Sequence, residues 1–353
     1  MRRRVFVSGS LLAAAGAAAS VWGVGRSRGA PGARLTFGSE QLPDGRVLVR
    51  DAALAFGTTV SIAAIHEDPE IAVEAIDEAL ARTRRIDSLM TVYRAESQVG
   101  RLNALGALPN PDPHLVRVLE FSQRLSSLSG GAFDVTVQPL WTLYIECRRR
   151  GRTPTPHEVA EARSLVDWSA VEAIDEALAR TRRITLGRPG MSITLNGVAQ
   201  GYAADLALAA LRERGVRDAL IDTGEFGAEG ERRPRQPWTV GIQHPRTADA
   251  VLATVAMDGR FLATSGDYAT SFTDDFVHHH IFDPRTGDSP GGLSSVVVAA
   301  GSGMEADGLT KPMMVLERSL AKALLSQFPG SGAAWIDKSG RIAGSQDLPL
   351  GPG

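Results

Sequence analysis

Apolar residues along this chain recur at two spacings, one typical of helices and one typical of strands. In 69–87 they fall at helical spacing after Pro69, and the same argument predicts helices over 113–129, 156–165, 199–214 and 306–326. Alternating or β-branched runs predict two strands joined by a turn within 46–65, and further strands near 192–195, 219–222, 238–243, 251–256, 260–264 and 294–300. Because strands and helices do not alternate regularly, we expect an α+β fold: one large domain with a mixed or antiparallel sheet and flanking helices.

One stretch of fourteen residues, VEAIDEALARTRRI, occurs twice, at 73–86 and at 171–184. The first copy lies inside a predicted helix. The second lies where the flanking residues favour a short hairpin. Since the flanks of the two copies share nothing, the pair is not a structural repeat with a period. We interpret it as a recent local duplication or an alteration of the sequence, and give it no functional weight.

Composition excludes several classes of function. The only cysteine of the 353 residues is Cys147, which rules out a disulfide framework and multi-cysteine metal sites. Residues 1–30 hold five arginines and no acidic residue, so the remaining chain is clearly acidic although the whole carries a net charge of only −2. An acidic body is unsuited to nucleic acid. Lysine is nearly absent, occurring only as Lys311, Lys322 and Lys338.

The first 30 residues are predicted to be an export signal. Arg2, Arg3 and Arg4 precede an Ala-rich apolar run, the pattern of a secretory signal, and the pair Arg3-Arg4 with Phe6 resembles a twin-arginine signal. We therefore expect a periplasmic protein exported in the folded state. The alternative is an uncleaved membrane anchor, for which the apolar stretch is just long enough.

Two polar segments of the C-terminal half are candidates for chemistry. The segment 278–287 (HHHIFDPRTG) has three adjacent histidines followed by two turns. If 278–280 form a strand that runs into a tight loop, one His and one Asp would reach a cleft; the alternative is a surface run of histidines. The segment 263–268 (ATSGDY) follows a predicted strand and could hold a phosphate through its backbone N–H groups, or be an ordinary polar turn.

Three further segments carry weaker signals. The stretch 195–205 (LNGVAQGYAAD) is a glycine-bearing turn that opens a helix, where a pyrophosphate could bind, although no dinucleotide or P-loop motif is present. The turn 129–134 (SGGAFD) could bring a Phe and an Asp to a ring, or could simply end a helix. Asp307 lies in the first turn of a predicted helix, where an acid usually complements the dipole but could also bind a hard cation.

The order of these segments is more specific than any one of them. Together with 56–58 (FGT), Tyr93, Ser97, 102–103 (LN) and 224–225 (GE), they occur in the order found in the FAD:protein FMN transferases, the flavin transferase family once called the thiamine-biosynthesis lipoproteins. The chain resembles this family over residues 46–316. The export signal, the wording TLNGVAQGY and the segment 222–225 (DTGE) are similar to the branch linked to maturation of nitrous oxide reductase.

The resemblance implies a T-fold-like flavin transferase domain, which we place at 34–345. It also implies a Mg²⁺-dependent reaction in which FMN from FAD is joined by a phosphoester to a Thr or Ser hydroxyl of a partner protein, with release of AMP. The partner would be an acceptor protein of a respiratory electron-transfer complex linked to nitrous oxide reduction. This chain contains no stretch that matches the family's acceptor pattern D-x-x-[ST]-G-A-[ST].

The resemblance also implies roles for individual residues. The candidate base is His279 or His280, with Asp283 shaping the catalytic site. The FAD-binding residues would be Tyr93, Ala132, Phe133, Asp134, Asn196, Gln200, Tyr202, Ser265, Gly266, Asp267 and Thr286. The metal would be bound by the Ala199 carbonyl, Asp307 and Thr310.

Two positions depart from the family pattern. Gln200 stands where most members have Lys, and Lys311 stands where the family has a Thr that binds the metal. Lysine cannot bind a hard cation while it is protonated. Three alternatives follow: Thr310 serves from one position away, Lys311 replaces the charge of the metal, or the site is damaged. A non-catalytic FAD-binding maturation factor is therefore the second hypothesis for this chain. Pro312 is expected to disturb the start of the helix.

Overall fold

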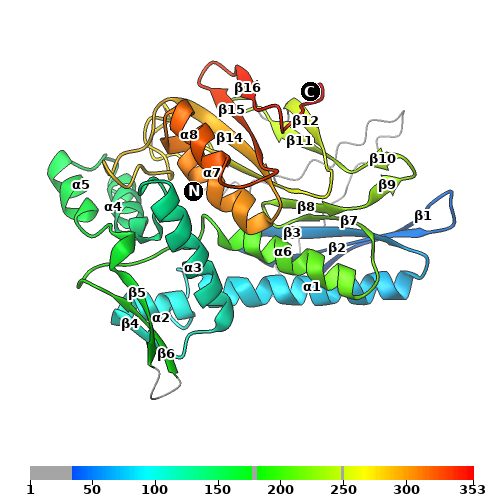
Figure 1. The fold of residues 1–353 in the computed structure, drawn as a ribbon, viewed down its shortest axis with the longest axis horizontal. Helices are drawn as coiled ribbons and strands as arrows, with labels where there is room; N and C mark the ends of the chain where they lie inside the picture. The colour runs from blue at the N-terminus through cyan, green and yellow to red at the C-terminus, as the bar shows by residue number, and fades with distance from the viewer. Residues whose placement is uncertain (1–33, 177–180, 248–249) are drawn as a thin grey trace.

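A computed structural model describes residues 34–176, 181–247 and 250–353. Within these residues, nine strands form one sheet in which every pairing is antiparallel, shown across the upper right of Figure 1. In sheet order they are β1 (Arg34–Gln41), β2 (Val47–Ala55), β3 (Thr58–His66), β7 (Asp218–Asp222), β8 (Phe226–Glu229), β13 (Phe261–Gly266), β14 (Leu293–Ala300), β15 (Gly332–Asp337) and β16 (Ile342–Gly344).

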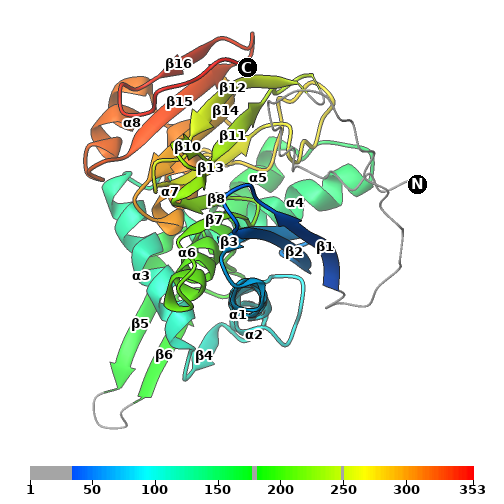
Figure 2. The ribbon, with the colours of Figure 1, turned by 90° about the vertical axis from the view of Figure 1, so that its right-hand side faces the viewer.

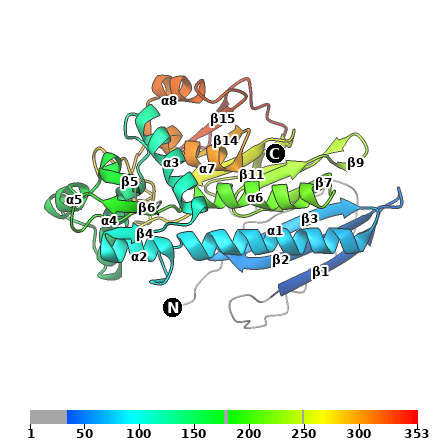
Figure 3. The same cartoon turned by 60° about the horizontal axis from the view of Figure 1, so that its bottom comes forward.

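Helices α1 (Pro69–Met90), α6 (Ala199–Glu213) and α7 (Gly303–Val315) cover one face of this sheet (Figure 3). α1 begins after Asp68, whose carboxylate accepts the Glu70 N–H, and it buries an Ala-rich stripe against α6. Where α6 meets α7, a Cβ atom on Gly201 would lie 2.0 Å from the carbonyl oxygen of Gly303. The two helices therefore approach so closely that only glycine fits, which sets the position of their N-terminal turns.

The other face of the sheet is covered by a hairpin of β11 (Thr239–Gln243) and β12 (Val251–Ala256) (Figure 2). Trp238 and Val240 pack there against Leu220 and Val297. A short pair, β9 (Glu231–Arg233) with β10 (Gln236–Pro237), extends from this side. Alternation of buried and exposed residues along β11 is what an antiparallel strand with one solvated face requires.

A second group of elements packs beside the end of the sheet and contributes its own core. It contains the three-stranded sheet β4-β6-β5, two 3₁₀ turns and five helices. Within the described residues these are α2 (Gln98–Leu105), β4 (Ala107–Pro109), α3 (Pro113–Leu128), η1 (Val135–Val137), α4 (Gln138–Arg149), α5 (Pro156–Arg163), η2 (Trp168–Ala170), β5 (Val171–Glu176), β6 (Thr181–Leu186) and α8 (Arg318–Leu325).

Most predicted elements are confirmed, including the α+β class, the strand pair within 46–65 and the hairpin at the second copy of the fourteen residues. Four predictions are wrong. The last helix is two helices, because Leu316 and Glu317 are extended between α7 and α8. Residues 192–195 form no strand, and 278–280 make only one isolated bridge, Ser271 with His279. Pro312 lies inside α7 instead of disturbing its start, which Ser302 caps.

The predicted signal at 1–30 lies outside the described residues. Among the residues that are described, no helix has both the length and the apolar character needed to cross a membrane.

Candidate functional site

A buried carboxylate, Asp307, lies where the first turns of α6 and α7 meet. It is 1% exposed, and its Oδ2 atom accepts the Gly201 N–H at 3.1 Å. Its Oδ1 atom accepts from the Lys311 ammonium, which also donates to the Asp307 carbonyl at 3.1 Å. The i, i+4 spacing on α7 places the lysine directly beside the carboxylate. Both carboxylate oxygens therefore have partners supplied by the chain itself.

The turn before α6 is shaped around this lysine. A Cβ on Gly197 would lie 2.9 Å from Cε of Lys311, so the aliphatic part of the lysine crosses the backbone at Gly197. Ala199, expected to offer its carbonyl to a metal, is the first residue of α6 and lies between Gly197 and Gly201. The predicted segments 195–205 and 306–310 are thus brought together. Asn196 is exposed beside them.

Strand β13 contributes the third side of this centre. The Ser265 and Thr310 hydroxyls share a hydrogen bond of 2.7 Å, and the Thr310 hydroxyl donates to the Asp307 carbonyl, also at 2.7 Å. Gly266 follows, where a Cβ would lie 2.4 Å from the Tyr268 ring. The end of β13 is therefore packed directly on α7, and Ser265 lies at the centre as predicted.

Two acids next to this centre were not assigned a role from the sequence. Glu225 is buried and accepts the Thr264 N–H at 3.1 Å. Burial raises its pKa well above the usual range, the Asp307 charge adds to the rise, and Lys311 opposes it. Burial also raises the pKa of Asp222 to about 7. The signal in the sequence was the segment 222–225 (DTGE), which places two acidic residues in a tight turn after a buried strand. Burying carboxylates is unfavourable, so acids in such a position indicate a functional site.

Gln200 ties the same turn to α6. Its Nε2 donates to the Thr223 carbonyl at 2.7 Å, and the Thr223 hydroxyl donates back to the Gln200 carbonyl at 3.0 Å. With these bonds, Gln200 joins the 222–225 turn to the start of α6. Its predicted role of contacting FAD stays a prediction.

The three histidines of 278–280 differ in how their ring nitrogens are used. His279 is fully buried; its Nε2 is 3.1 Å from the Pro290 carbonyl and its Nδ1 is 3.4 Å from the Ile281 N–H, so both nitrogens are engaged. His280 has its Nδ1 3.3 Å from the Thr270 carbonyl, which makes Nδ1 the protonated nitrogen. In the described part of the chain Nε2 of His280 has no hydrogen-bond partner, and so it can accept a proton.

The environment of His280 keeps its imidazole neutral. Burial lowers its pKa to about 4, and the charges of His279 and Lys311 act in the same direction. The ring stands edge-on to Trp141, with 6.2 Å between ring centroids. Because the ring is neutral and its Nε2 is free, His280 is the histidine of this segment that can accept a proton.

Asp283 and Thr286 shape the loop after the histidines. The Asp283 carboxylate pairs with the Arg285 guanidinium at 2.7 and 2.8 Å and also accepts the Arg285 N–H. The Gly287 N–H donates to the Asp283 carbonyl, closing the turn. Thr286 is exposed. The structure thus supports a loop-shaping position for Asp283.

Asp267 is more enclosed than a phosphate-binding loop would suggest. It is 0% exposed, and its oxygens accept from Arg246 at 2.8 and 2.7 Å and from Lys338 at 2.6 Å. The Arg246 guanidinium lies over the Phe276 ring, 4.1 Å from its centroid. These contacts hold three loops together at the end of β13, and a direct role toward FAD stays a prediction.

The remaining predicted residues lie in the second core or on its surface. Ala132 and Phe133 are buried, and Asp134 caps η1 through Thr136 and accepts the Trp168 N–H. Burial raises the pKa of Asp134 to about 6. The Thr194 N–H bonds to the Val135 carbonyl, so this segment borders the 195–205 turn.

Two predicted aromatic contacts to FAD differ in exposure. The Tyr202 hydroxyl is 2.7 Å from Nδ1 of His114, and Tyr202 is buried. Tyr93 is 73% exposed in the turn after α1. Its aromatic face is available to a ring from outside.

The predicted metal ligands are together, but their donor atoms do not fit a divalent cation. The Asp307 carboxylate is shared between an ammonium group and a backbone N–H, and the Thr310 hydroxyl is hydrogen-bonded to Ser265 and to the Asp307 carbonyl. Magnesium needs oxygen ligands that point at it in octahedral geometry. With Lys311 on Asp307, the arrangement holds a cation of the chain's own, and no chemical step is assigned here to a metal.

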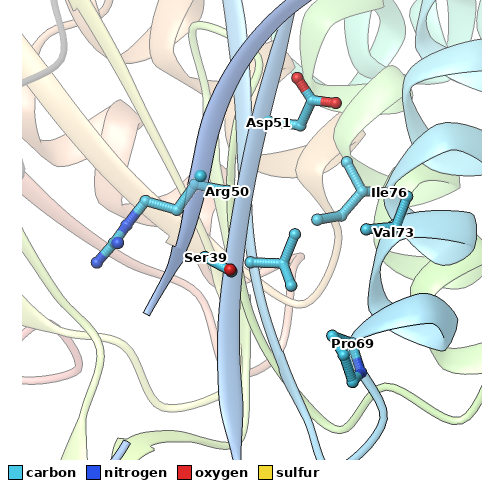
Figure 4. Close-up of a pocket in the computed structure, with 8 residues that line it drawn as sticks. Ser39, Arg50, Asp51, Pro69, Val73 and Ile76 are labelled. Carbon is cyan, nitrogen blue, oxygen red and sulfur yellow. The ribbon is translucent and has the colours of Figure 1, made fainter. Parts of the chain in front are cut away.

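A separate open cavity lies between β1, β2 and α1 (Figure 4). Ser39 and Arg50 line its strand side, and Pro69, Val73 and Ile76 line its helix side. Its lining shares no residue with the Asp307 centre.

Comparison with known proteins gives one consistent result. A model described as the ApbE family matches residues 56–336. A Haemophilus influenzae protein named FAD:protein FMN transferase is 28% identical over 270 residues, covering 72% of this chain and 75% of the relative. A Klebsiella pneumoniae protein of the same name is 30% identical over 273 residues, covering 74% and 84%.

The fold is also that of solved structures. The crystal structure of an ApbE protein from Thermotoga maritima superimposes with a TM-score of 0.72 at 27% identity, over 85% of this chain and 97% of that one. The large antiparallel sheet with flanking helices is therefore the architecture of these flavin transferases.

Proposed function

This chain belongs to the ApbE family, and on that premise we propose that it is a flavinyltransferase that takes FMN from FAD and joins it to a Thr or Ser hydroxyl of another protein. The observation that carries the proposal is His280, a neutral histidine with a free Nε2, close enough to Lys311 for that charge to act on its pKa. Relatives named FAD:protein FMN transferase support FAD as the substrate and a protein as the acceptor.

The reaction exchanges one phosphorus–oxygen bond for another. The acceptor oxygen bonds to the phosphorus on the FMN side of the pyrophosphate, the bridging P–O bond breaks, and AMP leaves with the bridging oxygen and its electron pair. The hydroxyl proton passes to Nε2 of His280. Such transfers depend on positioning and on stabilising the negative charge that develops on the phosphate oxygens.

The chain supplies groups for each of these tasks. Lys311 provides a positive charge next to the turn before α6, and the positive end of that helix dipole lies at the same turn. The Ser265 hydroxyl and the backbone at the end of β13 lie on the other side. We propose that the pyrophosphate binds between them, with His280 as the group that accepts the hydroxyl proton.

Magnesium is part of what the family resemblance implies, and the donor set around Asp307 does not fit it. The proposal therefore assigns charge stabilisation to the chain's own cation and helix dipole. For the partner and the compartment, we propose an exported acceptor of an electron-transfer complex. The sequence of 194–202 and 222–225, which resembles the nitrous oxide branch of the family, supports a link to nitrous oxide reduction.

A second candidate function is supported by the same ion pair. If Lys311 disables transfer, the chain would hold FAD as a non-catalytic maturation factor. The two functions differ in whether AMP is released.

The test is incubation of the purified chain with FAD and an acceptor that carries D-x-x-[ST]-G-A-[ST]. Flavin fluorescence on the acceptor in a denaturing gel, together with AMP, is the expected result. His280→Gln should lower the rate at least 100-fold, the size of a general-base effect. His157→Gln, on the exposed surface of α5, is the matched control. FAD binding with no AMP would favour the second function.

A further inference from the structure

We infer that the Lys311 ammonium is the resident cation of this site, so that the chain transfers FMN without a divalent metal. The inference rests on the proposed function and adds to it the identity of the group that neutralises the phosphate. Of the three alternatives that the sequence left open at Lys311, the contacts favour replacement of the metal's charge.

The first support is that both oxygens of the Asp307 carboxylate already have a partner within the chain. Asp307 gives one oxygen to Lys311 and the other to the Gly201 N–H at 3.1 Å. Gly201 cannot move away, because it packs against the backbone of Gly303. A dication would have to displace the ammonium and would then lie close to it, with two like charges in a buried space.

The second support is that the lysine is seated by its surroundings. The aliphatic part of the Lys311 side chain crosses Gly197, where a Cβ would lie 2.9 Å from Cε. A larger residue at position 197 would therefore displace the lysine side chain. The side chain is 21% exposed. An ammonium has three N–H donors, and the Asp307 carboxylate and carbonyl use two of them. The third donor is available to a phosphate oxygen.

The third support is that Thr310 does not stand in for the missing threonine. Its hydroxyl donates its proton to the Asp307 carbonyl at 2.7 Å and accepts from Ser265 at 2.7 Å. These bonds fix the hydroxyl between α7 and β13 and use both its proton and an acceptor site. Neither Thr310 nor Lys311 then leaves a place for magnesium.

Direct metal binding is the first arm of the test. Mn²⁺ is titrated into the full chain, and free Mn²⁺ is followed by electron paramagnetic resonance. The wild-type chain should take up no more Mn²⁺ than Asp307→Asn does. Uptake by the wild-type chain that Asp307→Asn abolishes would overturn the inference, whatever the activity.

Transfer to the acceptor in excess EDTA is the second arm. The wild-type rate should change less than twofold between EDTA and Mg²⁺. Lys311→Thr should lose at least 100-fold in EDTA, and Lys322→Thr, an exposed control on α8, should lose nothing. FAD binding by fluorescence quenching establishes that each variant is folded.

The outcomes separate the two proposals. A wild-type rate that disappears in EDTA and returns with Mg²⁺ overturns the resident cation and leaves the transferase intact. Equal rates for Lys311→Thr and the wild-type chain in EDTA also overturn it. Absence of transfer under every condition contradicts the proposed function instead, and the Mn²⁺ titration then decides the question of the cation alone.

Discussion

Two buried aspartates near the end of β13 are each paired with one of the chain's three lysines, and the pairs differ in balance. Asp267 faces two cations, Arg246 and Lys338. Its carboxylate oxygens accept two hydrogen bonds from Arg246 and one from Lys338. Asp307 faces one cation, Lys311, and a single backbone N–H. The Asp267 carboxylate thus has two positive side chains against its one negative charge, and the Asp307 carboxylate has one.

This difference separates a structural role from a chemical one. The cations on Asp267 come from loops far apart in the sequence, so the carboxylate holds those loops together. The cation on Asp307 comes from the same helix and adds no new connection between elements, but its ammonium borders the turn where an anion could bind. A buried charged group that joins no separate parts of the fold is a candidate for binding or chemistry.

The largest expected effect is that of neutralising Asp267. Asp267→Asn leaves two cations near each other without their carboxylate, and we expect the free energy of unfolding to fall by about 3–5 kcal/mol. Urea denaturation measures this loss. Asp337→Asn, at a more exposed pair with Arg341, should cost clearly less than Asp267→Asn. Equal losses of stability for the two variants would contradict the structural role of Asp267.

Replacing Lys311 should destabilise the fold more than replacing Lys338, because Asp307 has no second cation and Asp267 has Arg246. Lys311→Met leaves Asp307 buried without a cation and should cost about 2 kcal/mol, a value reduced by the lysine's partial exposure. Lys338→Met leaves Asp267 paired with Arg246 and should cost about 0.5–1 kcal/mol. Thermal unfolding of the two variants side by side decides the ranking, and a reversed order would contradict it.

His280 lies in the field of both pairs and can report on each. Lys311 lowers its pKa and Asp267 raises it, while burial sets the value of about 4. The ring is neutral above that pKa, so transfer should be constant from pH 8 down to about 5 and fall as the pH drops through about 4. By NMR titration of the His280 ring, Lys311→Met should raise the pKa and Asp267→Asn should lower it. Shifts of the same sign would refute this placement.

The fold should also respond to His280 in a defined direction. Since its folded pKa lies below the ordinary value of about 6.5, the unfolded chain binds the proton first. The stabilising contribution is complete above about pH 6.5 and is lost as the pH falls toward 4. His280→Gln should flatten stability between these values in a urea series, whereas His157→Gln should leave the slope unchanged.

The smallest effect tests the seat of Lys311. Gly197→Ala places a methyl group 2.9 Å from Cε of Lys311, and the flexible lysine can yield. We expect transfer to fall about tenfold while the free energy of unfolding changes by less than about 1 kcal/mol. Gly292→Ala, where no atom lies within 4 Å of the added carbon, should leave both unchanged. An unaltered rate for Gly197→Ala would show that the lysine's position there is unimportant.

The two copies of VEAIDEALARTRRI show how far local sequence determines this fold. The first copy lies inside the helix α1, and the second, at 171–184, forms most of the hairpin β5–β6. Val73 is 37% exposed in the helix, whereas its counterpart Val171 is 3% exposed; Ile86 and Ile184 are fully buried in the same core. The helical spacing is identical in both, so pairing of β6 with β4 and burial against the second core decide the outcome.

The site could be predicted only in part for the same reason. The order of segments identified the family and brought Ala199, Ser265, Asp307 and Thr310 to one place. It could not show that the Asp307 carboxylate also accepts the Gly201 N–H, because that contact depends on the approach of α6 to α7. The choice between His279 and His280 depended on which ring nitrogen the surrounding carbonyls occupy. Glu225 and Asp222 were missed because their importance comes from burial.

The most direct test of the account is a crystal structure of the chain grown with FAD and MnCl₂, with an anomalous difference map recorded near the manganese edge. The account predicts Nζ of Lys311 on the Asp307 carboxylate, no anomalous peak within ligand distance of Asp307, and a phosphate oxygen of FAD at the ammonium. A manganese peak bound by Asp307, with Lys311 turned away, would contradict it.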